Sequence, residues 1–223
     1  MRSMLMLFTA AVLAAPAAAQ SVNEPSSGVA FPTTMAVANG AQQSLAGTGI
    51  RTRTMLNVKV YAFGLYVDPT GARAALSAYA GRDAAALAND ATLYEALLRL
   101  SFPMSMRLVM TRNVSGEQMA EAFDGALRPR VVAAAGRGMA GGEAALTTFR
   151  GYFSVEQLTS GTELLFTCDN GTLHSQVASQ PKAPIGNPAL CWALFDVYLG
   201  REPISSNGKK SAVGRLPEVL AAR

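Results

Sequence analysis

GIRTRTMLNVKVYAFGLYVD, residues 49–68, is the stretch of sequence that narrows the fold most. Residues 57–67 within it are rich in β-branched and aromatic side chains and end at the turn-forming pair Asp68 and Pro69. This pattern predicts one long strand near the centre of a sheet. Gly64 in the middle of that strand indicates either a β-bulge or a place where another group packs closely against the backbone.

An arginine and a tyrosine make the same stretch a candidate binding site. Arg51 lies just before the predicted strand, and Tyr61 lies within it. An unpaired arginine is expensive to bury, but its planar guanidinium binds carboxylate or phenolate oxygens well. A tyrosine hydroxyl beside it would add a further polar group. From the spacing alone, a surface arginine and a core tyrosine are the simpler interpretation.

The rest of the chain carries further strand and helix signals and no repeat. Residues 94–111 hold two apolar pieces interrupted by Pro103, which indicates an edge strand or a bulge. Residues 115–118 form a capping box that opens a helix, and the Asn-Gly pair at 170–171 predicts a hairpin. Residues 187–200 predict a capped helix that is apolar nearly all round and therefore buried. Together these signals predict an α+β fold with an antiparallel sheet.

The composition excludes several classes of protein. The chain has 223 residues, 50% hydrophobic and 15% charged, which suits one folded domain and excludes a disordered chain. The net charge is only +4 and the charged residues are scattered along the chain, which does not predict nucleic-acid binding. One histidine and two cysteines exclude a zinc finger or a multi-histidine metal site. The Gly-x-Gly-x-x-Gly pattern at 136–141 follows a predicted helix instead of a strand, so we expect no dinucleotide and no other cofactor.

The start of the chain indicates export. Residues 1–19 combine a basic start, an apolar core and a small-residue end, which is typical of a signal peptide cleaved after Ala19. The apolar run is too short to span a bilayer, so we expect no membrane-spanning segment after cleavage. The alanine-rich composition fits a bacterium and predicts a periplasmic or secreted protein. Residues 20–44 are expected to be a flexible leader, and residues 45–223 the folded domain.

Two cysteines also bear on the compartment in which the protein works. Cys168 and Cys191 are the only cysteines in the sequence. In an oxidising compartment they are a candidate disulfide. Two small buried hydrophobic side chains fit the sequence equally well, and both interpretations stay open here.

Four segments resemble the chalcone isomerase-like family. The likeness extends from about residue 45 to residue 206, and the segments within it read GIRTRTMLNVKVYAFGLYVD, LRLSFPMSMRLVMTRNVSGEQMAEAF, YFSVEQLTSGTELLFTCDNGTLHSQV and IGNPALCWALFDVYLGREPIS. The resemblance implies an open-faced β-sandwich, in which a large antiparallel sheet carries a helical layer on one face with a ligand cleft between them. It also implies two kinds of function. Plant isomerases of the family close a chalcone to a flavanone, whereas its fatty-acid-binding relatives do no chemistry.

The resemblance assigns roles to individual residues. The family's cleft arginine falls on Arg51, with Arg53 as the alternative register. Tyr61 falls on the position that is tyrosine in the fatty-acid binders and threonine in the isomerases. The ligand implied for this pair is a small apolar or amphipathic anion, either a fatty acid or a flavonoid-like molecule.

The isomerase pattern is broken at three cleft positions. The catalytic tyrosine of the isomerases falls on Met119, and two further polar positions fall on Ala126 and Val197. A methionine cannot donate a hydrogen bond to a ketone oxygen on which charge develops. We therefore predict a non-catalytic binder whose apolar wall includes Met119, Phe123, Val197 and the helix around residues 192–198.

Two other functions remain open from the sequence. One is a chalcone–flavanone type of isomerase with a reduced active site, which would use Arg51, Tyr61 and a bound water. The other is a structural or partner-binding protein whose cleft is vestigial.

Overall fold

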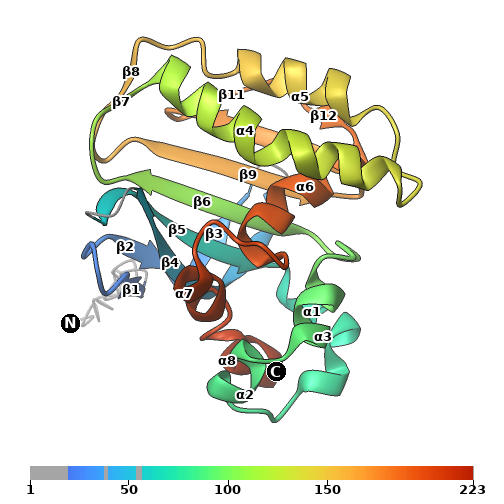
Figure 1. Cartoon of the computed structure of the whole chain (residues 1–223). Helices are drawn as coiled ribbons and strands as arrows, with labels where there is room; N and C mark the ends of the chain where they lie inside the picture. Colours follow the sequence, from blue (N-terminus) through green and yellow to red (C-terminus); the bar gives the residue numbers. More distant parts are fainter. Residues whose placement is uncertain (1–19, 38–39, 54–56, 223) are drawn as a thin grey trace, which may run out of the picture.

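An antiparallel sheet of eight strands forms the centre of the molecule in the computed structural model (Figure 1). The structure describes residues 20–37, 40–53 and 57–222. The strands follow one another across the sheet as β11 (Gln180–Pro181), β10 (Thr172–Val177), β9 (Glu163–Asp169), β6 (Met104–Met110), β5 (Val58–Val67), β4 (Gln42–Arg53) and β3 (Thr34–Ala36), and β12 (Ile185–Gly186) pairs with β10. Two shorter pairs lie apart from it, β1 (Ser21–Asn23) with β2 (Ala30–Pro32) and β7 (Val114–Ser115) with β8 (Gln157–Leu158). The α+β fold is confirmed.

The predicted central strand is β5, which lies between β4 and β6. Its pairing with both neighbours runs through Gly64 without a shift of register. A β carbon at Gly64 would lie 2.7 Å from Cδ1 of Phe31, which is too close for any side chain. The glycine is therefore explained by close packing and not by a bulge.

The prediction of an edge strand or bulge at Pro103 is wrong. β6 is a central strand between β5 and β9. Pro103 precedes its first residue, Met104, so the missing N–H of the proline breaks no bond of the ladder. The carbonyl of Pro103 accepts a hydrogen bond from the backbone N–H of Asp68, which holds the start of β6 beside the end of β5.

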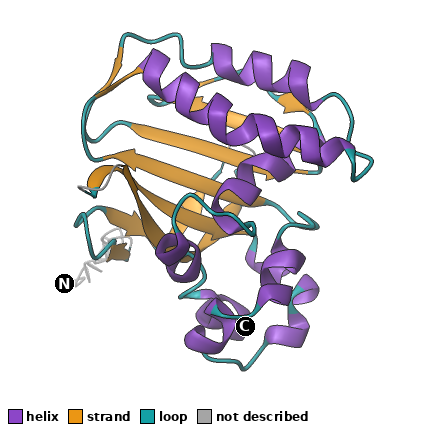
Figure 2. Ribbon diagram, in the orientation of Figure 1, coloured by secondary structure: helices purple, strands orange, loops and turns teal. Residues whose placement is uncertain are grey.

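Three helices cover one face of the sheet, α4 (Gly116–Ala135), α5 (Gly142–Gly151) and α6 (Pro188–Leu199) (Figure 2). The predicted capping box is present, because Ser115 and Gln118 each accept a hydrogen bond from the backbone N–H of the other. Asn187 caps α6 by accepting a hydrogen bond from the N–H of Leu190 at 2.9 Å. α6 contacts α4, α5 and β10, which explains why nearly all of its side chains are buried.

A second group of short helices closes one end of the sheet (Figure 1). It consists of α1 (Pro69–Ala75), the 3-10 helix η1 (Ser77–Tyr79), α2 (Ala84–Ala88), α3 (Ala91–Leu97), α7 (Ser206–Ser211) and α8 (Leu216–Ala221). α7 and α8 both pack on β4. At Gly47 a β carbon would lie 2.2 Å from the carbonyl oxygen of Ser211, so this glycine permits the close approach of α7.

The segment after residue 19 departs from the predicted flexible leader. Residues 20–37 contribute β1, β2 and β3, and β3 pairs with β4 at the edge of the main sheet. Phe31 is fully buried against Leu45, Tyr66 and other side chains on the face of the sheet that the helices leave open. Because that face is apolar, covering it removes apolar surface from water, and this explains why residues 20–37 are folded against it. The predicted signal peptide lies outside the described residues.

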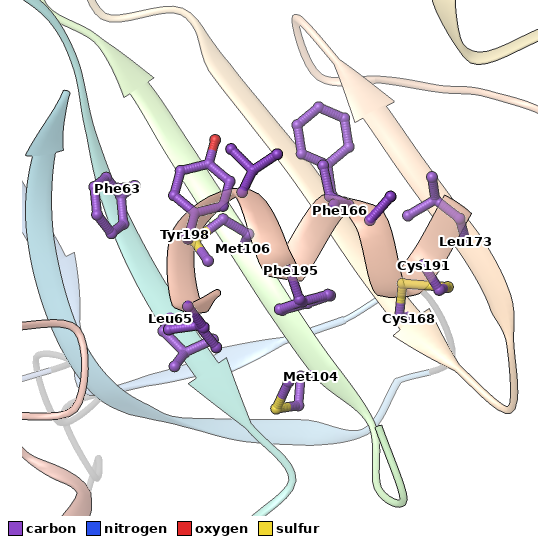
Figure 3. Packing of buried hydrophobic residues seen from close by; sticks show 14 of the residues in the cluster. Phe63, Leu65, Met104, Met106, Phe166, Cys168, Leu173, Cys191, Phe195 and Tyr198 are labelled. Carbon is purple, nitrogen blue, oxygen red and sulfur yellow. A yellow bond between two sulfur atoms is a disulfide. The ribbon is translucent and has the colours of Figure 1, made fainter. Parts of the chain in front are cut away.

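A disulfide joins Cys168 of β9 to Cys191 of α6, with the two Cα atoms 5.8 Å apart (Figure 3). The bond ties α6 to the sheet, and both cysteines belong to the main hydrophobic cluster. None of the helices in the described ranges is long and apolar enough to cross a membrane.

Candidate functional site

Arg51 and Tyr61 are direct partners across the β4–β5 ladder. Residues that face each other in an antiparallel pair point to the same side of the sheet, so both side chains lie on the same face. Tyr61 belongs to the hydrophobic cluster on the helical side, which fixes that face as the one covered by helices. The register between β4 and β5 shifts directly after this pair, between Arg51 and Thr52. Arg53, the alternative candidate for the family's cleft arginine, pairs instead with Val58.

Tyr61 is hydrogen-bonded to a second tyrosine at the end of α6. Its hydroxyl oxygen lies 3.1 Å from that of Tyr198, and both residues are buried. Burial raises the pKa of Tyr61, although the bond to Tyr198 and the charge of Arg51 act in the opposite direction. The pKa of Tyr198 is raised well above its usual value, again mainly because of burial. Both tyrosines are therefore protonated and neutral at pH 7.

Arg51 is half-buried and is held by the backbone. Its Nη1 donates a hydrogen bond of 2.7 Å to the carbonyl oxygen of Ile204, in the segment that follows α6. Among the described residues no carboxylate forms an ion pair with Arg51. Its charge is therefore oriented but not neutralised by the groups around it.

A cavity of about 610 Å³ opens beside this pair, between β4, β5 and the helices α4 and α6. The five predicted ligand-binding residues, Arg51, Tyr61, Met119, Phe123 and Val197, all line it. The rest of its lining is formed by Arg53, Val58, Val60, Arg112, Asn113, Val114, Gln118, Glu121, Ala122, Gly125, Ala126, Arg130, Glu202 and Ile204. The volume lies within the range of small-molecule sites.

Charged side chains are concentrated at the exposed rim. Arg53, Arg112, Glu121 and Glu202 are all exposed, so opposite charges partly offset one another there. Arg130 lies deeper and is neutralised, because its Nε donates to Oδ2 of Asp196 at 2.9 Å. In the described part of this lining, Arg51 is thus the half-buried guanidinium without an acidic partner.

The cavity wall is apolar next to this charge. Met119 and Phe123 project from α4 and are 2% and 4% exposed, and Val197 projects from α6. Phe123 packs edge-on against Phe166 of the sheet, with ring centroids 5.6 Å apart, and so its position is fixed. The three side chains offer no hydrogen-bond donor. An apolar ligand with one anionic end fits this distribution of groups.

The structure changes the role of α6 in the site. The sequence placed residues 192–198 in an apolar wall, but Tyr198 contributes a hydroxyl that contacts Tyr61. Trp192 does not line the cavity and instead lies under the guanidinium of Arg137, 4.6 Å from its ring centroid. The carbonyl of Ile204 was missed altogether, since a backbone acceptor leaves no signal in a sequence.

Within the described residues, no group of three or more histidine, cysteine, aspartate or glutamate side chains is placed to hold a metal ion. The polar groups at this pair are the guanidinium of Arg51 and the phenol of Tyr61, which line the cavity, and the phenol of Tyr198, which is hydrogen-bonded to Tyr61. A guanidinium is a donor only and is not a metal ligand.

An antiparallel sheet with helices over one face and a cleft between them defines the class of protein. The family is settled by the sequence: residues 41–213 match the model of the family described as chalcone isomerase like, and the chain belongs to that family. This confirms the resemblance found in the sequence.

Curated relatives within the family have two kinds of name. The chain is 32% identical over 207 residues to fatty-acid-binding protein 2 of Arabidopsis thaliana, an alignment that covers 88% of this chain and 50% of the relative. The chain thus spans about half the length of that relative. It is 30% identical over 211 residues to a chalcone–flavanone isomerase of Oryza sativa subsp. japonica, covering 87% of this chain and 89% of the relative.

A solved structure has the same fold. A crystal structure of a fatty-acid-binding protein of Arabidopsis thaliana superposes with a TM-score of 0.76 at 22% identity, covering 91% of this chain and 100% of that one. The open-faced sandwich predicted for this chain is therefore confirmed as its fold.

Proposed function

We propose that this protein binds a fatty acid or a similar apolar anion in the cavity between the sheet and α4 and α6. The observation that carries the proposal is the placement of Arg51, half-buried and without an acidic partner, beside an apolar wall. A carboxylate there would gain a charge-assisted hydrogen bond from the guanidinium. The chain of the ligand would cover Met119, Phe123 and Val197.

Catalysis is the less favoured alternative. Acyl and enone chemistry needs donors aimed at the oxygen on which charge develops. Met119 and Val197 supply none, so an isomerase would depend on Arg51, Tyr61 and a bound water. The similarity to chalcone–flavanone isomerases keeps this alternative worth testing.

We also propose that the protein is exported, with a signal peptide cleaved after Ala19, and works in the periplasm or outside the cell. The disulfide between Cys168 and Cys191 supports this, because such bonds persist mainly in oxidising compartments. A protein kept in the cytoplasm would be expected to hold both cysteines as thiols. The mass of the protein purified from the periplasm reports both cleavage and disulfide formation.

The binding proposal is tested by native mass spectrometry of the purified protein, followed by solvent extraction of whatever it carries. We expect an adduct of fatty-acid mass that is absent from Arg51→Ala. Dodecanoate added to delipidated protein should raise the free energy of unfolding, by about 2.7 kcal/mol at a hundred times its Kd.

The control is Arg53→Ala, which removes a guanidinium two residues along the same strand at the exposed rim. It should retain the adduct, because an exposed charge contributes little to binding. If the wild-type protein carries no adduct and dodecanoate does not stabilise it, the proposal is wrong. Chalcone consumption above the rate in buffer would then favour the isomerase.

A further inference from the structure

Tyr61, in the cavity lining, and its hydrogen-bond partner Tyr198 share their hydroxyl protons unequally. Tyr61 and Tyr198 are both protonated, so the pair has two hydroxyl protons, and one of them lies in the bond of 3.1 Å between the oxygens. The described residues offer neither hydroxyl another hydrogen bond. The second proton therefore has no acceptor within the described part of the protein.

The position of the two rings decides which proton is left over. Tyr61 lines the cavity, whereas Tyr198 is 1% exposed and its ring packs against that of Phe63, with centroids 4.9 Å apart (Figure 3). If Tyr61 donated to Tyr198, the proton of Tyr198 would be left among apolar side chains, and an unmade buried hydrogen bond is costly. If Tyr198 donates to Tyr61, the proton of Tyr61 faces the cavity, where a ligand can accept it.

We infer that Tyr198 is a positioning residue that selects the head group of the ligand. By donating to the oxygen of Tyr61, it turns the Tyr61 proton toward the cavity beside the Arg51 guanidinium. The cavity lining then offers two donors on adjacent strands, which suits the two oxygens of a carboxylate better than the single oxygen of an alcohol. The inference rests on the proposed function, since it concerns the ligand of the same cavity.

Hydrogen bonds in a chain polarise one another, so the bond from Tyr198 makes Tyr61 a stronger donor. An anionic acceptor gains more from a stronger donor than a neutral one does. Tyr198 is thus expected to matter for a carboxylate and to matter little for an alcohol of the same chain length.

The test compares the affinities of dodecanoate and dodecanol for delipidated wild-type protein and for Tyr198→Phe. We expect Tyr198→Phe to weaken dodecanoate binding about tenfold, equivalent to about 1.4 kcal/mol, and to change dodecanol binding by less than about twofold. Tyr61→Phe should weaken dodecanoate binding at least as much. Adding Tyr198→Phe to Tyr61→Phe should then have no further effect, because Tyr198 acts only through Tyr61.

The matched control is Tyr66→Phe. Tyr66 is fully buried on the opposite side of the sheet, and its hydroxyl donates to the carbonyl of Pro32 at 2.9 Å. This variant should lose stability but keep the preference for dodecanoate over dodecanol. Equal losses for both ligands in Tyr198→Phe would show a packing role and overturn the inference, as would an undiminished effect in the Tyr61→Phe background. Failure of the wild-type protein to bind either ligand would remove the proposed function itself.

Discussion

At the scale of single residues, two arginines in the cavity differ in what balances their charge. Arg130 is paired with Asp196, and each of the two side chains is 16% exposed. Within the described residues, the guanidinium of Arg51 donates to the carbonyl of Ile204 and has no carboxylate partner. An incoming anion therefore gains more from Arg51 than from Arg130, whose charge is already compensated.

Asp196→Asn should remove this difference and carry a cost in stability. The substitution leaves the guanidinium of Arg130 without its negative partner, so the free energy of unfolding should fall by about 1–3 kcal/mol. The uncompensated charge should also raise the affinity for dodecanoate several-fold. Urea denaturation measures the first effect, and calorimetric titration measures the second.

Asp124→Asn is the comparison for Asp196→Asn. It breaks an ion pair with Arg128 one turn along α4 and a longer one, of 4.0 Å, with Arg150 of α5, and none of these residues lines the cavity. Such pairs contribute about 0.3–0.5 kcal/mol, so stability should change little and affinity not at all. Equal behaviour of the two variants would contradict the role given to Asp196.

Among the polar residues of the site, only those that belong to a recognisable strand motif could be predicted from the sequence. Arg51 and Tyr61 were found because both belong to one contiguous motif. Tyr198 was placed on the correct helix but in the wrong role, since a helix that is apolar nearly all round gives no sign that one hydroxyl meets a partner 137 residues away. The pairing of Arg130 with Asp196 joins α4 to α6 and depends on how the two helices pack.

At the scale of elements, α6 is the part of the site most dependent on a covalent bond. Cys191 and Tyr198 are seven residues apart on α6, which is about two turns, so they point to the same side of the helix. The disulfide therefore anchors the helix face that also carries the hydroxyl to Tyr61 (Figure 3).

Replacing both cysteines by alanine should loosen this helix. The disulfide closes a loop with a sequence separation of 23, for which chain entropy predicts about 3 kcal/mol of stabilisation. The double variant should therefore unfold about 6–12 °C below the oxidised protein. Differential scanning calorimetry with and without dithiothreitol provides the measurement.

Reduction supplies the internal control. Dithiothreitol should lower the unfolding temperature of the wild-type protein toward that of the double variant and leave the double variant unchanged. An oxidised wild-type protein that unfolds at the same temperature as the double variant would show that the bond does not stabilise the fold.

The elements with local signals were predictable, and those defined by distant contacts were not. The hairpin at 170–171 has positive φ at both Asn170 and Gly171, as an Asn-Gly turn requires. The capping box and the Asn187 cap are equally local. β1 to β3 are only three residues each, and they pack on an apolar sheet face that includes Leu45, Ala62, Tyr66 and Val109. No periodicity within the segment could reveal this.

At the scale of the whole molecule, buried phenols make the fold sensitive to alkaline pH. Burial raises the pKa of Tyr61, Tyr66 and Tyr198, and it raises the pKa of Tyr94 to about 12. In the unfolded chain the same side chains ionise near the usual value of 10.0. Above that pH the unfolded chain binds fewer protons than the folded protein, so the free energy of unfolding must fall as the pH rises. Below it neither state is ionised, and these tyrosines contribute no pH dependence.

Urea denaturation at several pH values above the usual tyrosine pKa, together with tyrosinate absorbance, measures this effect. We expect the urea midpoint to fall steadily from about pH 10 upward, and the buried tyrosines to ionise only as the protein unfolds. The double variant Tyr61→Phe and Tyr198→Phe should show a shallower fall, since it lacks two of the groups responsible. A protein in which every tyrosine ionises near pH 10 while the fold stays intact would contradict the burial of this pair. It would also remove the neutral donor in the cavity lining, because the same burial keeps the Tyr61 proton in place for a ligand.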